Sequence, residues 1–99
     1  MRIDTSIDGP ADDGTLRAAV EERLRWALGS HSADVRRIAV KLKPMEGGAE
    51  CRMRVHLRDR RTLTVTGTGR DAEDAVATAS ARAGAAVART IDTDRLLGI

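Results

Sequence analysis

Several residue types are scarce in this sequence, and each scarcity excludes a class of protein. Cys51 is the one cysteine in 99 residues, so neither an internal disulfide framework nor a cysteine-rich zinc site can form. Trp26 is the one aromatic residue, which argues against the stacking platforms of proteins that bind single-stranded nucleic acid. No apolar run approaches the roughly 18 residues that span a bilayer, and the polar start at residues 1–4 lacks the apolar stretch of a signal peptide.

These absences, and a length that supports one hydrophobic core, bound the class of protein. We expect a single cytoplasmic domain over residues 1–91, followed by a short tail over residues 92–99 that either docks or frays. We expect no membrane segment, no metal and no cofactor.

Charge is distributed unevenly along the chain. The net charge is +2, yet residues 35–61 carry nine Lys or Arg against three acidic residues, a balance of +6. Residues 1–34 hold four cations against seven acids, and residues 62–99 hold four against five. A basic segment in a nearly balanced chain indicates a polyanionic partner. Composition alone leaves open a solvated charged face as the alternative.

Alternation of apolar and polar residues predicts four strands, at residues 1–7, 35–43, 50–58 and 62–68. Residues 44–48 form a flexible connection between the second and third strands, because they contain Pro44 and two glycines. The predicted inward-facing residues of the last three strands are Ile38, Val40, Leu42, Cys51, Met53, Val55, Leu57, Leu63 and Val65.

Two stretches have the spacing of amphipathic helices. The first covers residues 14–28, with Asp12 or Asp13 as the N-cap and Gly29 as a left-handed C-cap. Its apolar face holds Leu16, Val20, Leu24, Ala27 and Leu28. We expect Trp26 and Arg23 at the edge of that face, with the indole covering the margin of the core.

The second helix covers residues 71–91. Its stripe is mostly alanine, which allows close packing on the sheet. The element order is strand, helix, three strands, helix. It predicts a two-layer α+β sandwich in which two helices cover one face of a four-stranded, mostly antiparallel sheet.

The second and third strands place their charges on the uncovered face of the sheet. The period of two puts these side chains outward: Arg37, Lys41, Lys43, Arg52, Arg54, His56 and Arg58. Clustered cations that cannot all pair internally are expected to bind phosphates, without reading a sequence. Arg82 and Arg89 share one flank of the second helix and extend this surface, unless they are ordinary exposed arginines.

Residues that could carry catalysis are few. His31 lies in a serine-containing loop and His56 lies among cations, and neither has an evident carboxylate to orient it. Cys51 alternates with Met53 and Val55 on the apolar face, which favours a buried, inert thiol. We therefore expect a protein that is not an enzyme.

Four stretches together resemble the ribosome hibernation-promoting factors, which are stationary-phase inhibitors of the small ribosomal subunit. They are LRAAVEERL at 16–24, VRRIAVKL at 35–42, GGAECRMRV at 47–55 and DAEDAV at 71–76. The resemblance implies a β-α-β-β-β-α domain, similar in element order to double-stranded RNA-binding domains. It also implies a short-form translational regulator, made under stress, that binds ribosomal RNA, occludes the mRNA and tRNA channel and preserves idle ribosomes.

The same resemblance implies RNA-binding roles for arginines on both helices. Arg17, Arg23 and Arg25 match basic positions of the first helix, and Arg82 and Arg89 match positive positions of the last. Where family members usually carry a run of Lys and Arg, this last helix is rich in alanine. That departure motivates an alternative, a protein-interaction or weakly self-associating module of the same fold that has lost ribosome affinity.

Overall fold

A computed structural model of the chain describes residues 1–8 and 14–96. The elements are β1 (Arg2–Ile7), α1 (Gly14–Leu28), a 3-10 helix η1 (Gly29–Asp34), β2 (Val35–Met45), β3 (Gly48–Leu57), β4 (Thr62–Gly69) and α2 (Ala72–Leu96). The predicted caps Asp12 and Asp13, and residues 97–99 of the predicted tail, lie outside the described residues. Within the described residues, no helix combines the length and hydropathy needed to cross a membrane.

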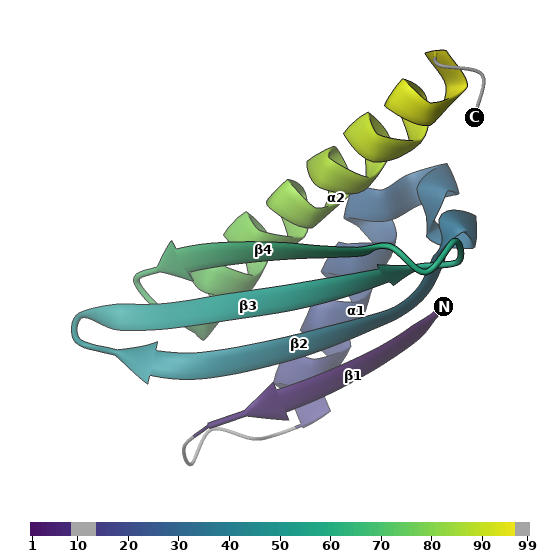
Figure 1. The fold of residues 1–99 in the computed structure, drawn as a ribbon. Helices are drawn as coiled ribbons and strands as arrows, with labels where there is room; N and C mark the ends of the chain where they lie inside the picture. Colours follow the sequence, from purple (N-terminus) through teal and green to yellow (C-terminus); the bar gives the residue numbers. More distant parts are fainter. Residues whose placement is uncertain (9–13, 97–99) are drawn as a thin grey trace.

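The four strands form one sheet in the order β1-β2-β3-β4. β1 runs parallel to β2, while the β2–β3 and β3–β4 pairs are antiparallel hairpins. Both helices lie on the same side of this sheet, and the opposite side is uncovered (Figure 1). The predicted two-layer α+β architecture and its element order are therefore confirmed.

The core lies between the helices and the sheet and is built from aliphatic side chains, alanines, one Met and one Cys. Period-two alternation brings the apolar residues of β2 and β3 to the helix side, as predicted. The buried set is Val20, Leu24, Leu28, Val35, Ile38, Val40, Leu42, Ala49, Cys51, Met53, Val55, Leu57, Ala75, Val76, Ala79, Ala83 and Val87.

Glycine and alanine allow α2 to approach both its neighbours closely. A Cβ added at Gly67 of β4 would lie 2.4 Å from the amide nitrogen of Ala79. A Cβ added at Gly84 would lie 2.5 Å from the carbonyl oxygen of Ala27 on α1. The prediction that the alanine stripe brings this helix close to the sheet is borne out, and the approach also depends on glycine.

Trp26 contradicts its predicted role at the core margin, because its side chain is 83% exposed. The buried residues of α1 are Val20, Leu24 and Leu28, which repeat every four positions. A residue two positions from Leu24 lies about 200° around the helix axis, on the opposite side. Ala27, which was also assigned to the apolar face, is exposed although its carbonyl lies beside Gly84.

Three boundaries also differ from the prediction. The connection between β2 and β3 is a tight turn at residues 46–47, because the strands extend to Met45 and from Gly48. β3 ends at Leu57, so Arg58 lies in the following turn. α2 continues to Leu96, so residues 92–96 belong to the helix. Gly29 has φ +53, which confirms the left-handed C-cap.

Candidate nucleic-acid interface

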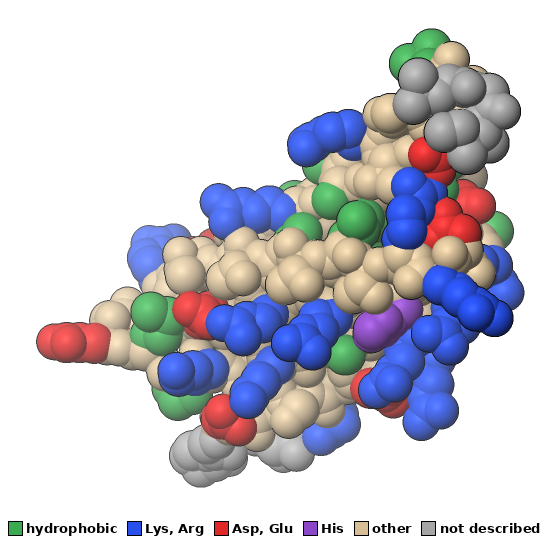
Figure 2. Space-filling model, in the orientation of Figure 1, with side chains coloured by type: hydrophobic (Ala, Val, Ile, Leu, Met, Phe, Trp, Pro, Cys, Tyr) green, Lys and Arg blue, Asp and Glu red, His purple; other side chains and the backbone are tan. Residues whose placement is uncertain are grey.

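The uncovered face of the sheet carries most of the predicted cations. β2 exposes Arg37, Lys41 and Lys43 on this face, and β3 exposes Arg52 and Arg54. Figure 2 shows Lys and Arg side chains gathered across the middle of the face, over these two strands. We call these five residues the basic face. The sequence predicted their common side because one face of each strand is needed for the core.

The sheet register sets cations beside one another. Lys41 is directly opposite Arg52, and Ala39 is opposite Arg54. Directly opposite residues of an antiparallel pair have Cβ atoms about 4.5–5.5 Å apart, and like charges at that separation repel. This repulsion falls when an anion binds between the cations.

Hydroxyl groups border the basic face on the outer strands. Ser6 of β1 is opposite Lys41, and Thr66 of β4 is opposite Arg52. One row across the sheet is therefore Ser6, Lys41, Arg52 and Thr66. A hollow of about 420 Å³ lies over this part of the face, lined by Asp4, Thr5, Ser6, Arg37, Ala39, Val40, Lys41, Arg52 and Arg54. Serine and threonine hydroxyls donate hydrogen bonds to phosphate oxygens, so the row suits that ligand.

Asp4 neutralises part of the basic face. Its Oδ2 accepts a 2.8 Å hydrogen bond from Nε of Arg37, and its Oδ1 accepts one of 3.2 Å from Nε of Arg2. Desolvation raises the pKa of Asp4, but the hydrogen bonds and charges of Arg2 and Arg37 outweigh it and hold the pKa below its usual value. Oε1 of Glu50 lies 3.9 Å from Nη2 of Arg52, so these two side chains form an ion pair. Among residues 1–8 and 14–96, Lys41, Lys43 and Arg54 form no ion pair, so their charges face solvent.

Arg58 is not part of the basic face, contrary to the prediction. It lies in the turn after β3, where its Nε donates a 2.6 Å hydrogen bond to the carbonyl oxygen of Ala33. This contact joins the turn to η1. The strand ends one residue earlier than its alternation predicts. The backbone of the turn, and not the strand alternation, therefore sets the direction of the Arg58 side chain.

The helix arginines lie on the other side of the molecule, and two of them bind the edges of the sheet. Arg17 of α1 donates to the carbonyl oxygen of Thr5 on β1 at 3.0 Å, and Arg82 of α2 donates to that of Thr66 on β4 at 2.6 Å. β1 and β4 are the edge strands, and covered edges resist pairing with other chains. Arg23, Arg25 and Arg89 are exposed on the helices. The predicted cations therefore do not form one continuous surface.

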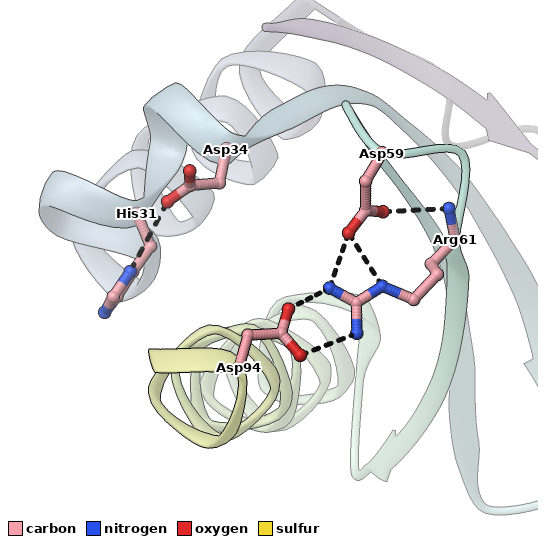
Figure 3. Close-up of polar contacts among 5 residues, drawn as sticks. All are labelled: His31, Asp34, Asp59, Arg61 and Asp94. Carbon is pink, nitrogen blue, oxygen red and sulfur yellow. Dashed lines mark hydrogen bonds and ion pairs between the residues drawn. The ribbon is translucent and has the colours of Figure 1, made fainter. Parts of the chain in front are cut away.

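A second cluster was not visible in the sequence. Arg61, which follows the β3–β4 turn, bonds Asp59 within the turn and Asp94 near the end of α2 (Figure 3). The hydrogen bond from Arg61 lowers the pKa of Asp59 and raises that of Arg61 itself. The same view also shows the contact between His31 and Asp34 of η1, whose Nδ1 and Oδ2 atoms lie 3.7 Å apart. Arg61 counts toward the +6 of the basic segment, but two carboxylates already neutralise it.

Cys51 has the properties of an inert core thiol. Its side chain is fully buried, and burial raises its pKa to about 12. Across the described ranges, His, Cys, Asp and Glu side chains form no group of three that could hold a metal ion. The exposed cations of the basic face are suited to anion binding.

Comparison with known proteins shows which fold this is. No family model and no curated protein matches the sequence. Several solved structures do match, and two of them illustrate the similarity. A ribosomal subunit interface protein from Coxiella burnetii has a TM-score of 0.83 and 14% identity, with 93% of this chain and 99% of that one covered. The N-terminal domain of protein Y from Thermus thermophilus has a TM-score of 0.72 and 19% identity, with 90% of this chain and 94% of that one covered. The chain has their fold.

The similarity to the ribosomal subunit interface protein and to protein Y runs nearly end to end, so it includes the sheet and both helices. The resemblance suggested by the sequence is thus confirmed at the level of structure. At 14% and 19% identity, the similarity shows the fold alone.

Proposed function

We propose that the protein is a ribosome-associated hibernation factor that binds the small ribosomal subunit through its basic face. The observation that carries the proposal is the placement of Lys41, Arg52 and Arg54 side by side on an uncovered sheet face. Two of these three, Lys41 and Arg54, have no ion pair within the described residues. One structural neighbour is named as a ribosomal subunit interface protein, which supports the same partner.

The mechanism is occlusion of the channel for mRNA and tRNA. A compact domain that presents cations to ribosomal RNA phosphates gains affinity without base readout, because phosphates are the same at every nucleotide. Such binding needs no catalytic group and no cofactor. Activity in this role implies a cytoplasmic protein made when ribosomes are idle, as in stationary phase or stress.

The predicted RNA-binding cations divide by their surroundings into direct contacts and supporting positions. The basic face supplies the direct contacts. Arg23, Arg25 and Arg89 would reach RNA only if the subunit also surrounds the helix layer. Arg17, Arg58 and Arg82 already bond backbone carbonyls, so RNA would compete with those bonds or share their remaining donors.

Cosedimentation with isolated small subunits over a salt series tests the proposal. Five phosphate contacts give a slope of log K against log salt of about −4 to −5, using the duplex-DNA coefficient. The double variant Arg52→Glu/Arg54→Glu should lose most binding at moderate salt. The control Arg70→Glu/Arg95→Glu makes the same change in net charge away from the basic face, and should bind nearly as the wild type does. Equal loss in both variants, or a flat salt response, would contradict the proposal.

A self-associating module is the second candidate, and one observation favours it. Leu96 is 87% exposed at the end of α2, which extends beyond the sheet (Figure 1). Light scattering on the wild type and on Leu96→Ser decides the matter. A concentration-dependent dimer that Leu96→Ser dissociates, together with no subunit binding, would replace the first proposal by this one.

A further inference from the structure

Trp26 separates two hollows on the helix side of the molecule. One, of about 670 Å³, is lined by Ala18, Glu21, Glu22, Arg25, Trp26 and Gly29. The other, of about 250 Å³, lies between α1 and α2 and is lined by Arg23, Trp26, Ala27, Ala77, Ser80 and Ala81. The indole is therefore a wall shared by both hollows, and its 83% exposure leaves its ring available to a ligand.

The hollow between the helices contains an unused hydrogen-bonding group. Ser80 is 2% exposed, and its Oγ has no hydrogen-bond partner in the described part of the chain. Buried hydroxyls are nearly always paired, so an unpaired one on a residue that lines a hollow calls for an explanation. A ligand atom that comes within hydrogen-bond distance gives the hydroxyl a partner.

The lining of the smaller hollow selects the shape and charge of its ligand. Ala27, Ala77 and Ala81 line this hollow beside the indole. The hollow's volume of about 250 Å³ is below the range for drug-sized molecules, which fits a single flat ring system. Arg23 is the one charged residue among those lining it. The larger hollow has Glu21 and Glu22 in its lining, and these carboxylates repel a phosphate.

We propose that the hollow between α1 and α2 binds one unpaired nucleotide. The base stacks on the indole of Trp26, Arg23 holds the phosphate, and the Ser80 hydroxyl bonds an edge atom of the ring. Base stacking on aromatic side chains recognises single-stranded RNA in many unrelated proteins. This nucleotide site extends the proposed function. It rests on that function only for the source of the nucleotide, which is either an RNA strand or a free mononucleotide.

Trp26 itself reports binding, because the chain has no other Trp and no Tyr. Its emission, excited at the red edge of indole absorption, is recorded while the full chain is titrated with AMP or with a short oligoadenylate. Saturable quenching is the expected result. Quenching by both ligands, or by AMP alone, assigns the site to a mononucleotide unit, and quenching by the oligoadenylate alone assigns it to a base within a strand. No quenching by either ligand up to millimolar concentration overturns the proposal.

Matched variants separate the two hollows. Ala81→Leu fills the proposed site, and Ala18→Leu fills the other hollow; both alanines are exposed helix residues, so both variants are expected to fold. Quenching should disappear in Ala81→Leu and persist in Ala18→Leu. Quenching that survives Ala81→Leu, or that Ala18→Leu abolishes, shows that the base binds elsewhere and overturns the assignment.

Two further substitutions test the polar contacts. Ser80→Ala should weaken binding about three- to tenfold, the usual range for one hydrogen bond, and Arg23→Ala should weaken AMP more than adenosine. Equal affinities of AMP and adenosine in the wild type would contradict the role of Arg23. These titrations need no ribosomes, so loss of the nucleotide site and loss of subunit binding are scored separately.

Discussion

The guanidinium of Arg61 lies against the carboxylate of Asp94, 33 residues later in the chain. The contact joins the β3–β4 turn to the last turns of α2, which would otherwise extend past the sheet with few partners. It accounts for a helix that continues through the polar residues 92–95, where the sequence predicted its end.

Asp94→Ala is expected to loosen the end of α2 while leaving the core intact. Amide hydrogens of residues 91–96 should exchange faster, because helix ends without tertiary contacts open at low free energy. Amides of β2 and β3 should be unaffected. Asp92→Ala is the matched control, since Asp92 is exposed on the same turn and forms no ion pair within the described residues. Equal acceleration in both variants would show that the Arg61 contact is irrelevant to the helix end.

Acid should weaken the same cluster through Asp59. The pKa of Asp59 is lowered from 3.8 in the folded protein, chiefly by the hydrogen bond from Arg61. Because this pKa is lower in the folded protein than in the unfolded chain, ionised Asp59 stabilises the fold. This stabilisation is complete well above pH 3.8 and is lost as the pH falls through the folded-state pKa. Thermal unfolding of wild type and Asp59→Asn over a pH series measures it. The difference in Tm should be largest near neutral pH and vanish in acid, and a difference that is independent of pH would count against this cause.

Gly84→Ala should destabilise the fold, although alanine is ordinarily the better helix residue by about 1 kcal/mol. The added Cβ would lie 2.5 Å from the carbonyl oxygen of Ala27, and forcing two packed helices apart typically costs about 1–3 kcal/mol. Gly14→Ala is the control, because within residues 1–8 and 14–96 its added Cβ meets nothing within 4 Å beyond its own chain neighbours and helix backbone. Urea unfolding should show a lower midpoint for Gly84→Ala and an unchanged or higher one for Gly14→Ala. A stabilised Gly84→Ala would mean that α1 and α2 can separate at little cost.

Arg60→Gly should stabilise the protein. Arg60 has φ +75, and its amide donates to the carbonyl oxygen of Leu57 at 3.1 Å in a turn that ordinarily places glycine at this position. A non-glycine residue with this φ costs about 1–2 kcal/mol. Glycine removes this cost, but it also makes the unfolded chain more flexible, which offsets part of the gain in stability. We expect a net gain of about 0.5–1 kcal/mol in the free energy of unfolding, measured by urea titration. A decrease would show that the Arg60 side chain contributes more than its backbone strain costs.

The fold could be predicted from the sequence because its signals are local. Ile38, Val40 and Leu42 alternate with charged or small residues in a pattern that fits one strand facing one core. The identity of the basic face followed from the same alternation. The hydrophobicity of Trp26 predicts the wrong position, because its helical phase relative to Leu24 and Leu28 places it on the opposite side of α1.

The other features that the sequence does not predict depend on contacts between residues that are distant along the chain. The sequence does not show that Arg17 and Arg82 bond carbonyls of Thr5 and Thr66, since those contacts exist only after the helices pack. The same holds for Arg61 with Asp94, which extends α2. Ser80 within an alanine-rich stripe gives no local sign that its hydroxyl will be buried without a partner.

The parallel pairing of β1 with β2 has a consequence for the order of folding. Arg2 pairs with Arg37, 35 residues away, whereas Met45 pairs with Gly48 across a tight turn. Closing the long loop costs more entropy than closing either hairpin, so β2, β3 and β4 are expected to assemble first. Until β1 docks, the free edge of β2 is open to strands of other molecules. Aggregation during synthesis or refolding should therefore begin at β2, and variants that delay β1 should aggregate even where the finished fold is stable.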